Sequence, residues 1–154
     1  MILTGIGATN EHAKTIIQSY KKCTGKDLIH VNNEASLFDQ LFHAPIIVLS
    51  HGVEDDPILN FGNREALKLW ELDWETFIKT PSRLTAEPME REERDRFFEI
   101  VTEKGFVDNY TGIRISSNGT RFYIVKATVW NLVDDEGKYQ GQAASFKEYE
   151  YIKR

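Results

Sequence analysis

Hydrophobic and polar residues alternate with a period of two between Phe106 and Phe146, as they do in β-strands that are buried on one side. Two groups of turn-forming residues interrupt this alternation, Asn118-Gly119 and the acidic run 134–137. Both central residues of a tight type I′ turn adopt positive φ angles, which asparagine and glycine tolerate best. The pattern therefore predicts three antiparallel strands joined by two hairpins.

A two-residue loop at Asn118-Gly119 would also fix the register of the first two strands. Ile115 would then lie opposite Phe122, with both side chains on the core face of the sheet. Continued alternation brings Lys126 onto this face, where a charged side chain fits poorly. Either a bulge near residues 111–112 shifts the phase, or Lys126 lies at the rim with its aliphatic stem buried. The opposite face is also rather apolar, so we expect the N-terminal helices or a partner chain to cover part of it.

The first hundred residues contain amphipathic helical segments, whose apolar side chains recur every three to four residues, and two short apolar runs. Each short apolar run is bounded by turn-forming residues and therefore predicts a strand. The order of elements is typical of an α+β protein with helices on one face of an antiparallel sheet. We predict helices over 10–22, from residue 32 or 33 to Pro45, from Asn63 to Trp70, from Asp73 to Ile78 and over 88–104, with strands over 46–50 and 58–61.

The chain has no internal repeat, flexible linker or low-complexity segment within its 154 residues. We expect residues 1–45 to form an N-terminal helical extension that packs on the domain or on a partner chain. Residues 46–154 are expected to form the domain itself. The sequence leaves open which of the two partners the extension contacts.

Charge and composition exclude several classes of function. The net charge of -5 and the dispersed basic residues disfavour binding to nucleic acid. Cys23 is the single cysteine, which excludes an internal disulfide and a four-cysteine zinc site. The N-terminus lacks the features of a signal peptide, and no stretch approaches ~20 consecutive apolar residues. We therefore expect a cytoplasmic protein without a membrane span.

Side chains of the kinds that bind metals or transfer protons are densest in the turn 51–56, which contains His51, Asp55 and Asp56. This set could bind a metal, or supply the acid–base residues of a small curved-sheet enzyme. A catalytic carboxylate of that class needs an apolar pocket that raises its pKa, whereas this turn is hydrophilic. The four histidines also lack the spacing of a zinc site. We therefore expect neither a metal nor catalysis, and the enzyme remains an alternative.

Five side chains are predicted to line a ligand pocket between the sheet and the short helices. A buried amide costs free energy unless it is hydrogen-bonded, and a polar ligand can provide that bond. The amides could instead be exposed or bonded to each other, the arginine could pair with Asp55 or Asp56, and the first tryptophan could belong to the core. The predicted lining residues are Trp70, Arg83, Trp130, Asn131 and Gln142.

Several runs of the sequence resemble a known family. The order of elements and the segments 58–63 and 130–137 are similar to the PAS fold. A closer resemblance is to the MEKHLA domain family, which is PAS-related and occurs as a lone bacterial domain and at the C-terminus of plant homeodomain–leucine-zipper transcription factors. The resemblance implies a PAS-like five-stranded antiparallel sheet with short helices on one face and two extra N-terminal helices. The MEKHLA-like runs are 51–63, 81–88, 112–116 and 141–144, and the likeness covers nearly the whole chain.

The resemblance implies a sensory or interaction domain that takes part in signalling by binding a small molecule or a partner protein. We expect either a retained ligand or an enclosed cavity of at least ~300 Å³. The protein is also expected to be a homodimer. A pure homodimerisation module without a ligand is an alternative, in which the first helix and the second apolar sheet face would meet their copies.

Two cofactors of PAS-class proteins are not expected here. Flavin photosensors of this class carry a reactive cysteine on the helix beside the pocket, and the segment 64–78 contains none. Haem-binding relatives use a histidine on the long helix, and residues 87–104 contain none. The resemblance therefore gives no support for a flavin that forms a cysteine adduct, or for haem bound by a helix histidine.

Overall fold

The computed structural model describes residues 3–152, apart from the side chains of residues 88–91, 94 and 98. Within this range one antiparallel sheet holds six strands in the order β2-β1-β5-β4-β3, and β6 pairs with the first part of β4. The predicted α+β fold with a PAS-like sheet is confirmed, and β6 is an addition to the five predicted strands. The strands are β1 (Ile47–His51), β2 (Leu59–Gly62), β3 (Phe106–Ile115), β4 (Arg121–Val133), β5 (Tyr139–Phe146) and β6 (Glu148–Tyr151).

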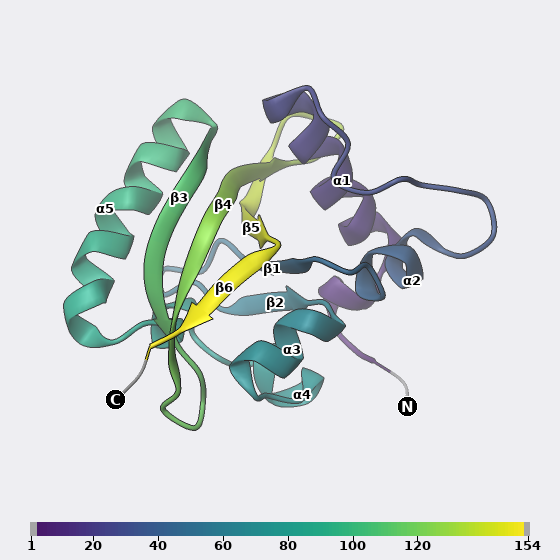
Figure 1. Ribbon diagram of the computed structural model, residues 1–154. Helices are drawn as coiled ribbons and strands as arrows, with labels where there is room; N and C mark the ends of the chain where they lie inside the picture. The colour runs from purple at the N-terminus through teal and green to yellow at the C-terminus, as the bar shows by residue number, and fades with distance from the viewer. Residues whose placement is uncertain (1–2, 153–154) are drawn as a thin grey trace.

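Helices lie on both sides of the sheet (Figure 1). Two lie on one side, α1 (Asn10–Thr24) and α2 (Leu37–Phe42), preceded by the short 3₁₀ turn η1 (Ile6–Ala8). None of the described helices has the length and hydrophobicity needed to span a membrane. The remaining helices and 3₁₀ turn connect β2 to β3. They are α3 (Arg64–Trp70), α4 (Trp74–Phe77), the 3₁₀ turn η2 (Ser82–Thr85) and α5 (Pro88–Lys104), which runs alongside β3.

The second helix is shorter than the pattern predicts, because a side chain competes for the backbone that would begin it. Gln40 accepts a hydrogen bond from the Asn32 amide at 2.9 Å and donates to the carbonyls of Asn32 and Ala35. These bonds hold 32–35 in a loop, and the helix begins after Ser36, whose hydroxyl accepts a bond from the Asp39 amide. Side-chain bonds to local backbone are a known alternative to helical ones.

The N-terminal helix α1 packs on the sheet of its own chain. The Trp130 indole Nε1 donates to the Ile16 carbonyl at 3.3 Å, and Ser19 exchanges two hydrogen bonds with the backbone of Val133. The apolar cluster on this side includes Ala13, Ile16, Leu41, Val48, Trp130 and Leu132. Helices α1 and α2 therefore pack against the second apolar face of the sheet within one chain.

The predicted register of the first hairpin is wrong by one residue. Ser116 and Thr120 close the loop, with the Ser116 amide donating to the Thr120 carbonyl at 2.9 Å, so the loop has three residues and ends at Gly119 with φ 82°. Ile115 therefore lies opposite Arg121, and Arg114 takes the place opposite Phe122. Contacts outside the hairpin favour this loop, because Ser116 Oγ donates to the Glu71 carboxylate at 2.6 Å.

A bulge in β4 then changes which side chains face the short helices. Lys126 has a positive φ of 52° and an exposed side chain, and it is the extra residue where the β3–β4 register shifts opposite Thr111. A bulge near residues 111–112 was one of the two alternatives that the sequence left open, and the structure places the extra residue on the partner strand. Ile124 and Ala127 consequently face the same cluster. Trp130 faces α1 instead, which corrects the predicted alternation.

Candidate functional site

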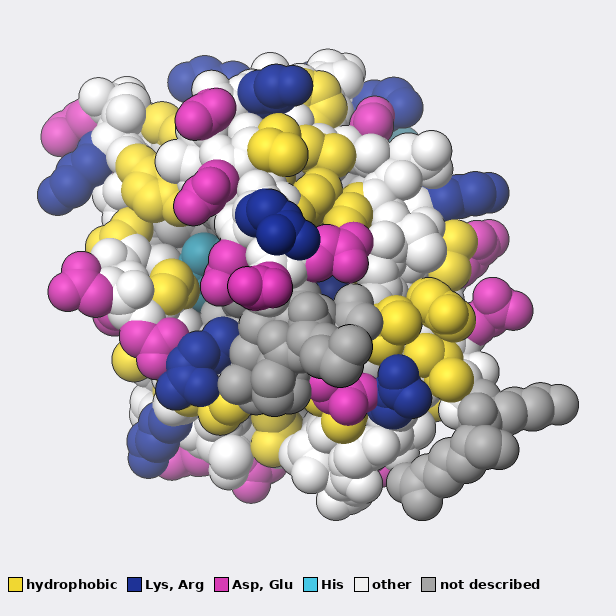
Figure 2. All heavy atoms as spheres, turned by 90° about the vertical axis from the view of Figure 1, so that its left-hand side faces the viewer, with side chains coloured by type: hydrophobic (Ala, Val, Ile, Leu, Met, Phe, Trp, Pro, Cys, Tyr) yellow, Lys and Arg dark blue, Asp and Glu magenta, His cyan; other side chains and the backbone are white. Residues whose placement is uncertain are grey.

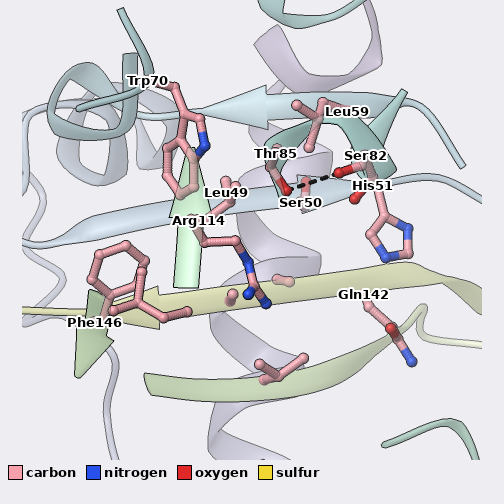
Figure 3. A pocket seen from close by; sticks show the side chains of 14 residues that line it. Leu49, Ser50, His51, Leu59, Trp70, Ser82, Thr85, Arg114, Gln142 and Phe146 are labelled. Carbon is pink, nitrogen blue, oxygen red and sulfur yellow. Dashed lines mark hydrogen bonds between the residues drawn. The ribbon is translucent and has the colours of Figure 1, made fainter. Parts of the chain in front are cut away.

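A small cavity lies between the sheet and the segment that connects β2 to β3 (Figure 3). Trp70 from α3 and Ser82 and Thr85 from η2 form one side of it. Each is fixed locally: Asn63 Oδ1 accepts a bond from the Ala66 amide and caps α3, while the Thr85 hydroxyl donates to the Ser82 carbonyl at 2.8 Å. Strand residues complete the lining: Leu49, Ser50, His51, Leu59, Arg114, Ile124, Val129, Gln142, Ala143, Ala144 and Phe146.

The cavity has a volume of only about 40 Å³. Pockets for drug-sized ligands measure roughly 300–1,000 Å³, so this cavity is far smaller than the enclosed cavity that was expected. Large side chains account for the difference: the Trp70 ring stacks edge-on against Phe122 at 5.3 Å and lies 6.3 Å from Phe146. The cavity as it stands has room for a few heavy atoms.

A wider cleft of about 590 Å³ adjoins the cavity, and His51 and Gln142 line both. The cleft lies between α5 and the turn that follows β1. Figure 2 views the molecule from the α5 side and shows acidic side chains grouped near the middle of this face. The described lining of the cleft comprises His51, Asp55, Asp56, Pro57, Arg83, Asp95, Glu99, Thr102, Glu103, Tyr139 and Gln142. Burial raises the pKa of Tyr139 above its ordinary value.

Two amides connect the cavity to the C-terminal end of α5. Gln142 Nε2 donates to Asn131 Oδ1 and to Thr102 Oγ1, both at 3.0 Å. Asn131 Nδ2 donates to the carbonyls of Val101 and Thr102 at 3.1 and 3.3 Å. The Val101 carbonyl also accepts from the Gly105 amide at 2.8 Å, so Asn131 adds to the cap at the C-terminal end of α5, and Gln142 connects to the same turn through the Thr102 hydroxyl. The mutually bonded arrangement was one of the alternatives that the sequence left open.

The structure brings only some of the five predicted lining residues together. Trp70 and Gln142 line the cavity, and Gln142 also reaches the cleft. Asn131 lies behind Gln142 and bonds to α5, whereas Arg83 lies on the cleft wall, where its Nε bonds to Asp56 at 3.1 and 3.2 Å. Trp130 lies on the opposite face of the sheet against α1, because the bulge at Lys126 reverses the alternation.

The Trp70 indole Nε1 is buried and has no hydrogen-bond acceptor among the described residues. The other two tryptophans donate to backbone carbonyls, Trp74 to Thr4 at 2.9 Å and Trp130 to Ile16. A buried donor without an acceptor costs about 1–3 kcal/mol. Trp70 is thus the indole whose N–H an incoming group can satisfy, and Figure 3 shows its nitrogen on the cavity side of the ring.

Sequence reasoning missed Arg114, which lines the cavity with only 6% of its surface exposed. Its Nη1 donates to the Ile113 carbonyl at 2.8 Å, its Nη2 lies 3.5 Å from the Tyr110 hydroxyl, and its guanidinium lies 5.5 Å from the centre of the Tyr110 ring. The predicted two-residue loop had placed this side chain on the other face. The serine and threonine at the ends of the loop 116–120 were the signal for the longer turn.

The turn after β1 has the geometry of a structural turn. Asp55 and Asp56 are exposed, and Asp56 pairs with Arg83, so neither carboxylate has the apolar surroundings that a general acid needs. His51 is 8% exposed, and its Nδ1 lies 3.0 Å from the Gly52 carbonyl oxygen. Among the described residues no group of three histidine, cysteine or acidic side chains is placed to hold a metal ion.

Solved structures with a similar fold include PAS and LOV domains. The PAS domain of a protein from Colwellia psychrerythraea matches with a TM-score of 0.62 and 11% identity, covering 74% of this chain and 92% of that one. A light-oxygen-voltage domain studied with a flavin analogue matches with a TM-score of 0.59 and 14% identity over 79% of this chain and 87% of that one. The dark structure of the Aureochrome1 LOV blue-light photoreceptor gives 0.55 and 16%, covering 82% and 89%.

These likenesses at low identity establish the fold, and a family model adds the sequence relationship. No curated protein matches the chain. The MEKHLA domain model matches residues 10–151, which include α1, the cavity and β6. By this match over nearly its whole length, the chain belongs to the MEKHLA domain family.

Proposed function

We propose that this chain is a regulatory sensory domain that binds a small polar molecule, with one end of the molecule inserted into the cavity. The observation that carries the proposal is the buried Trp70 indole N–H, which lines the cavity and has no acceptor among the described residues. An acceptor atom on a ligand would satisfy this donor. Proteins of the PAS and LOV class are generally sensory or regulatory, which supports the same role.

The shape of the two hollows supports a ligand with a small inserted end. The cavity has room for a few heavy atoms, while the adjoining cleft is large enough for the rest of the molecule. His51 and Gln142 stand where the two hollows meet. A ligand that crosses this point would contact Gln142, whose amide bonds to Thr102 of α5 and to Asn131. Binding would therefore change the hydrogen bonds that hold the end of α5, which is a direct route for a signal.

A flavin or a haem does not fit this site. An isoalloxazine or porphyrin ring needs far more than the 40 Å³ that Trp70 and its aromatic neighbours leave open. Cys23 lies on α1, on the opposite side of the sheet, where its Sγ is 3.7 Å from the Gly105 carbonyl oxygen and burial raises the pKa of its thiol.

The homodimerisation alternative has less support. Its proposed contact used the first helix and the second apolar sheet face, and these two surfaces pack on each other within one chain. Light scattering at micromolar concentration tests the alternative directly. A dimer that persists without any ligand, and whose affinity no ligand changes, would favour it over the sensory role.

Indole resonances in a ¹H–¹⁵N NMR spectrum test the proposal. The three tryptophans give three such signals, and W70F assigns that of Trp70 while preserving an aromatic ring. We expect a panel of small polar metabolites to contain molecules that move the Trp70 signal and leave that of Trp130, which is already bonded to Ile16, in place. W70F should weaken the binding of those molecules about fivefold or more, the effect of one lost hydrogen bond. A panel in which none moves the Trp70 signal would refute the proposal.

A further inference from the structure

We propose that the ligand end inserted into the cavity is a carboxylate, held by Arg114, and that the ligand is a small monocarboxylate. This inference rests on the proposed function, because it names the chemistry of the same cavity. The proposed function is argued from Trp70, whereas this inference is argued from the buried charge of Arg114. Arg114 is a permanently charged side chain on the sheet side of the cavity, and 94% of its surface is buried, the complement of its 6% exposure.

The described residues leave the charge of Arg114 without a counter-ion. Its contacts are one carbonyl at 2.8 Å, a tyrosine hydroxyl at 3.5 Å and the face of the Tyr110 ring. No aspartate or glutamate whose side chain is described forms an ion pair with it. A guanidinium has five N–H donors, so most of its hydrogen-bonding capacity is unused by these contacts.

A buried, unpaired ion is costly, since loss of hydration costs several kcal/mol and neutral partners recover only part of it. Arginine cannot avoid the cost by losing its proton. A carboxylate that entered the cavity would supply both the missing charge and two acceptor oxygens at the spacing of the guanidinium fork. Figure 3 shows the Arg114 guanidinium pointing towards the side of the cavity where His51 and Gln142 lie, which is the side of the cleft.

Other polar groups of the cavity fit the same guest. The Trp70 N–H is a donor without an acceptor among the described residues, and a carboxylate oxygen is an acceptor. The volume of about 40 Å³ admits a group of three or four heavy atoms and excludes a phosphate that carries a bulky ester inside the cavity. A planar carboxylate therefore matches the cavity in charge, acceptor count and size.

The cleft restricts the rest of the molecule. Its described lining holds five acidic residues, Asp55, Asp56, Asp95, Glu99 and Glu103, against one basic residue, Arg83, which is paired with Asp56. A second negative charge at the far end of the ligand would lie among these carboxylates and be repelled. The far end is therefore neutral or positively charged, as in a simple fatty or amino acid, and dicarboxylates are disfavoured.

Matched probes test the inference in the unaltered protein. Propionate and propionamide share size and shape and differ in charge, and malonate adds a second carboxylate to a chain of similar length. Titrations followed by the Trp70 indole signal at constant ionic strength should show propionate binding at least about tenfold tighter than propionamide, the margin expected of a charge-assisted fork. Malonate should bind more weakly than propionate.

Two variants locate the effect. R114M removes the charge and keeps the length of the side chain, and it should weaken propionate at least about tenfold while leaving propionamide unchanged. R64M removes an exposed arginine of α3 that lines neither the cavity nor the cleft, and it should leave propionate binding within about twofold. The comparison of probes in the wild-type protein remains decisive even if R114M does not fold.

The outcomes separate this inference from the proposed function. Equal binding of propionate and propionamide, or propionate binding that R114M leaves unchanged, would overturn the carboxylate assignment while the Trp70 site still stands. Malonate that binds as tightly as propionate would overturn the restriction to one carboxylate. If no probe and no panel member moves the Trp70 signal, both the inference and the proposed function fail.

Discussion

Acidification should destabilise this protein by about 3 kcal/mol through a single side chain, His12. His12 lies in the first turn of α1 and is 6% exposed, with its Nε2 2.9 Å from Ser50 Oγ. The Ser50 hydroxyl in turn donates to Asn60 Oδ1. Burial lowers the pKa of His12 from 6.5 to about 4, and a hydrogen bond to Asn60 opposes part of this shift.

The direction of the pH effect on stability follows from the protonation of His12 in the folded and unfolded states. In the unfolded chain His12 takes up a proton as the pH falls below about 6.5, whereas in the folded protein it stays neutral down to about pH 4. Between these values the unfolded state binds more protons, so acid favours unfolding. A shift of 2.5 pKa units, 6.5 minus 4, corresponds to about 3 kcal/mol at about 1.4 kcal/mol per unit. The destabilisation caused by His12 is absent above about pH 6.5, grows between pH 6.5 and 4, and stays constant below about pH 4.

Urea unfolding followed by tryptophan fluorescence at several pH values between 7.5 and 4 measures this dependence. H12Q retains an N–H donor for Ser50 without a titrating group, so its free energy of unfolding should fall by about 3 kcal/mol less than that of the wild type over this range. H30Q alters an exposed histidine and serves as the control, with the wild-type pH dependence. If H12Q shows the same pH dependence as the wild type, the neutral buried histidine is not the cause and the reasoning is refuted.

Two further predictions concern the connection between the cavity and its surroundings. Gly141 has φ 125°, and a side chain there would collide with the His51 carbonyl oxygen. G141A should therefore destabilise the protein by about 3 kcal/mol or more and lower its Tm in calorimetry. An unchanged Tm would contradict the close approach of β5 to β1. N131A removes the side-chain bonds to the Val101 and Thr102 carbonyls of α5. It should lower the free energy of unfolding by about 1–2 kcal/mol and speed amide hydrogen exchange in the last turn of that helix. Unchanged exchange there would refute the capping role.

Local patterns were enough to predict five of the six described strands and the order of the elements along the chain. The strands on either side of 134–137 and the capped helix at Asn63 follow from alternation, turn residues and an N-cap, all of which act over a few residues. The fold was therefore predictable, and the apolar side chains on one face of α1 correctly indicated that another surface must cover this face. The surface that covers it depends on contacts more than a hundred residues apart, such as Ser19 with Val133, and no local pattern contains them.

The site was harder to predict because two single-residue irregularities decide which side chains enter it. One extra residue in the 116–120 loop turns Arg114 towards the cavity, and one bulged residue, Lys126, turns Trp130 away from it. Side chains alternate along a strand, so a shift of one residue exchanges the two faces completely. Trp70 and Gln142 were predicted to line the site, and they are in the cavity because neither lies on the strands that these irregularities affect.

The energy available to a signal can be bounded from the contacts of α5. Among its described side chains Val101 is fully buried, and the last turn is held by Asn131 and Gln142. A ligand that takes the Gln142 amide replaces one or two hydrogen bonds, each worth about 1 kcal/mol net, so it can alter the balance between a docked and a released last turn by about 1–2 kcal/mol. That is a change of about five- to thirtyfold in population, within the usual range of coupling between sites. A helix held by a larger buried face would not respond to so small a change. Among the described side chains of α5 only Val101 is buried, which suits this helix to report on the cavity.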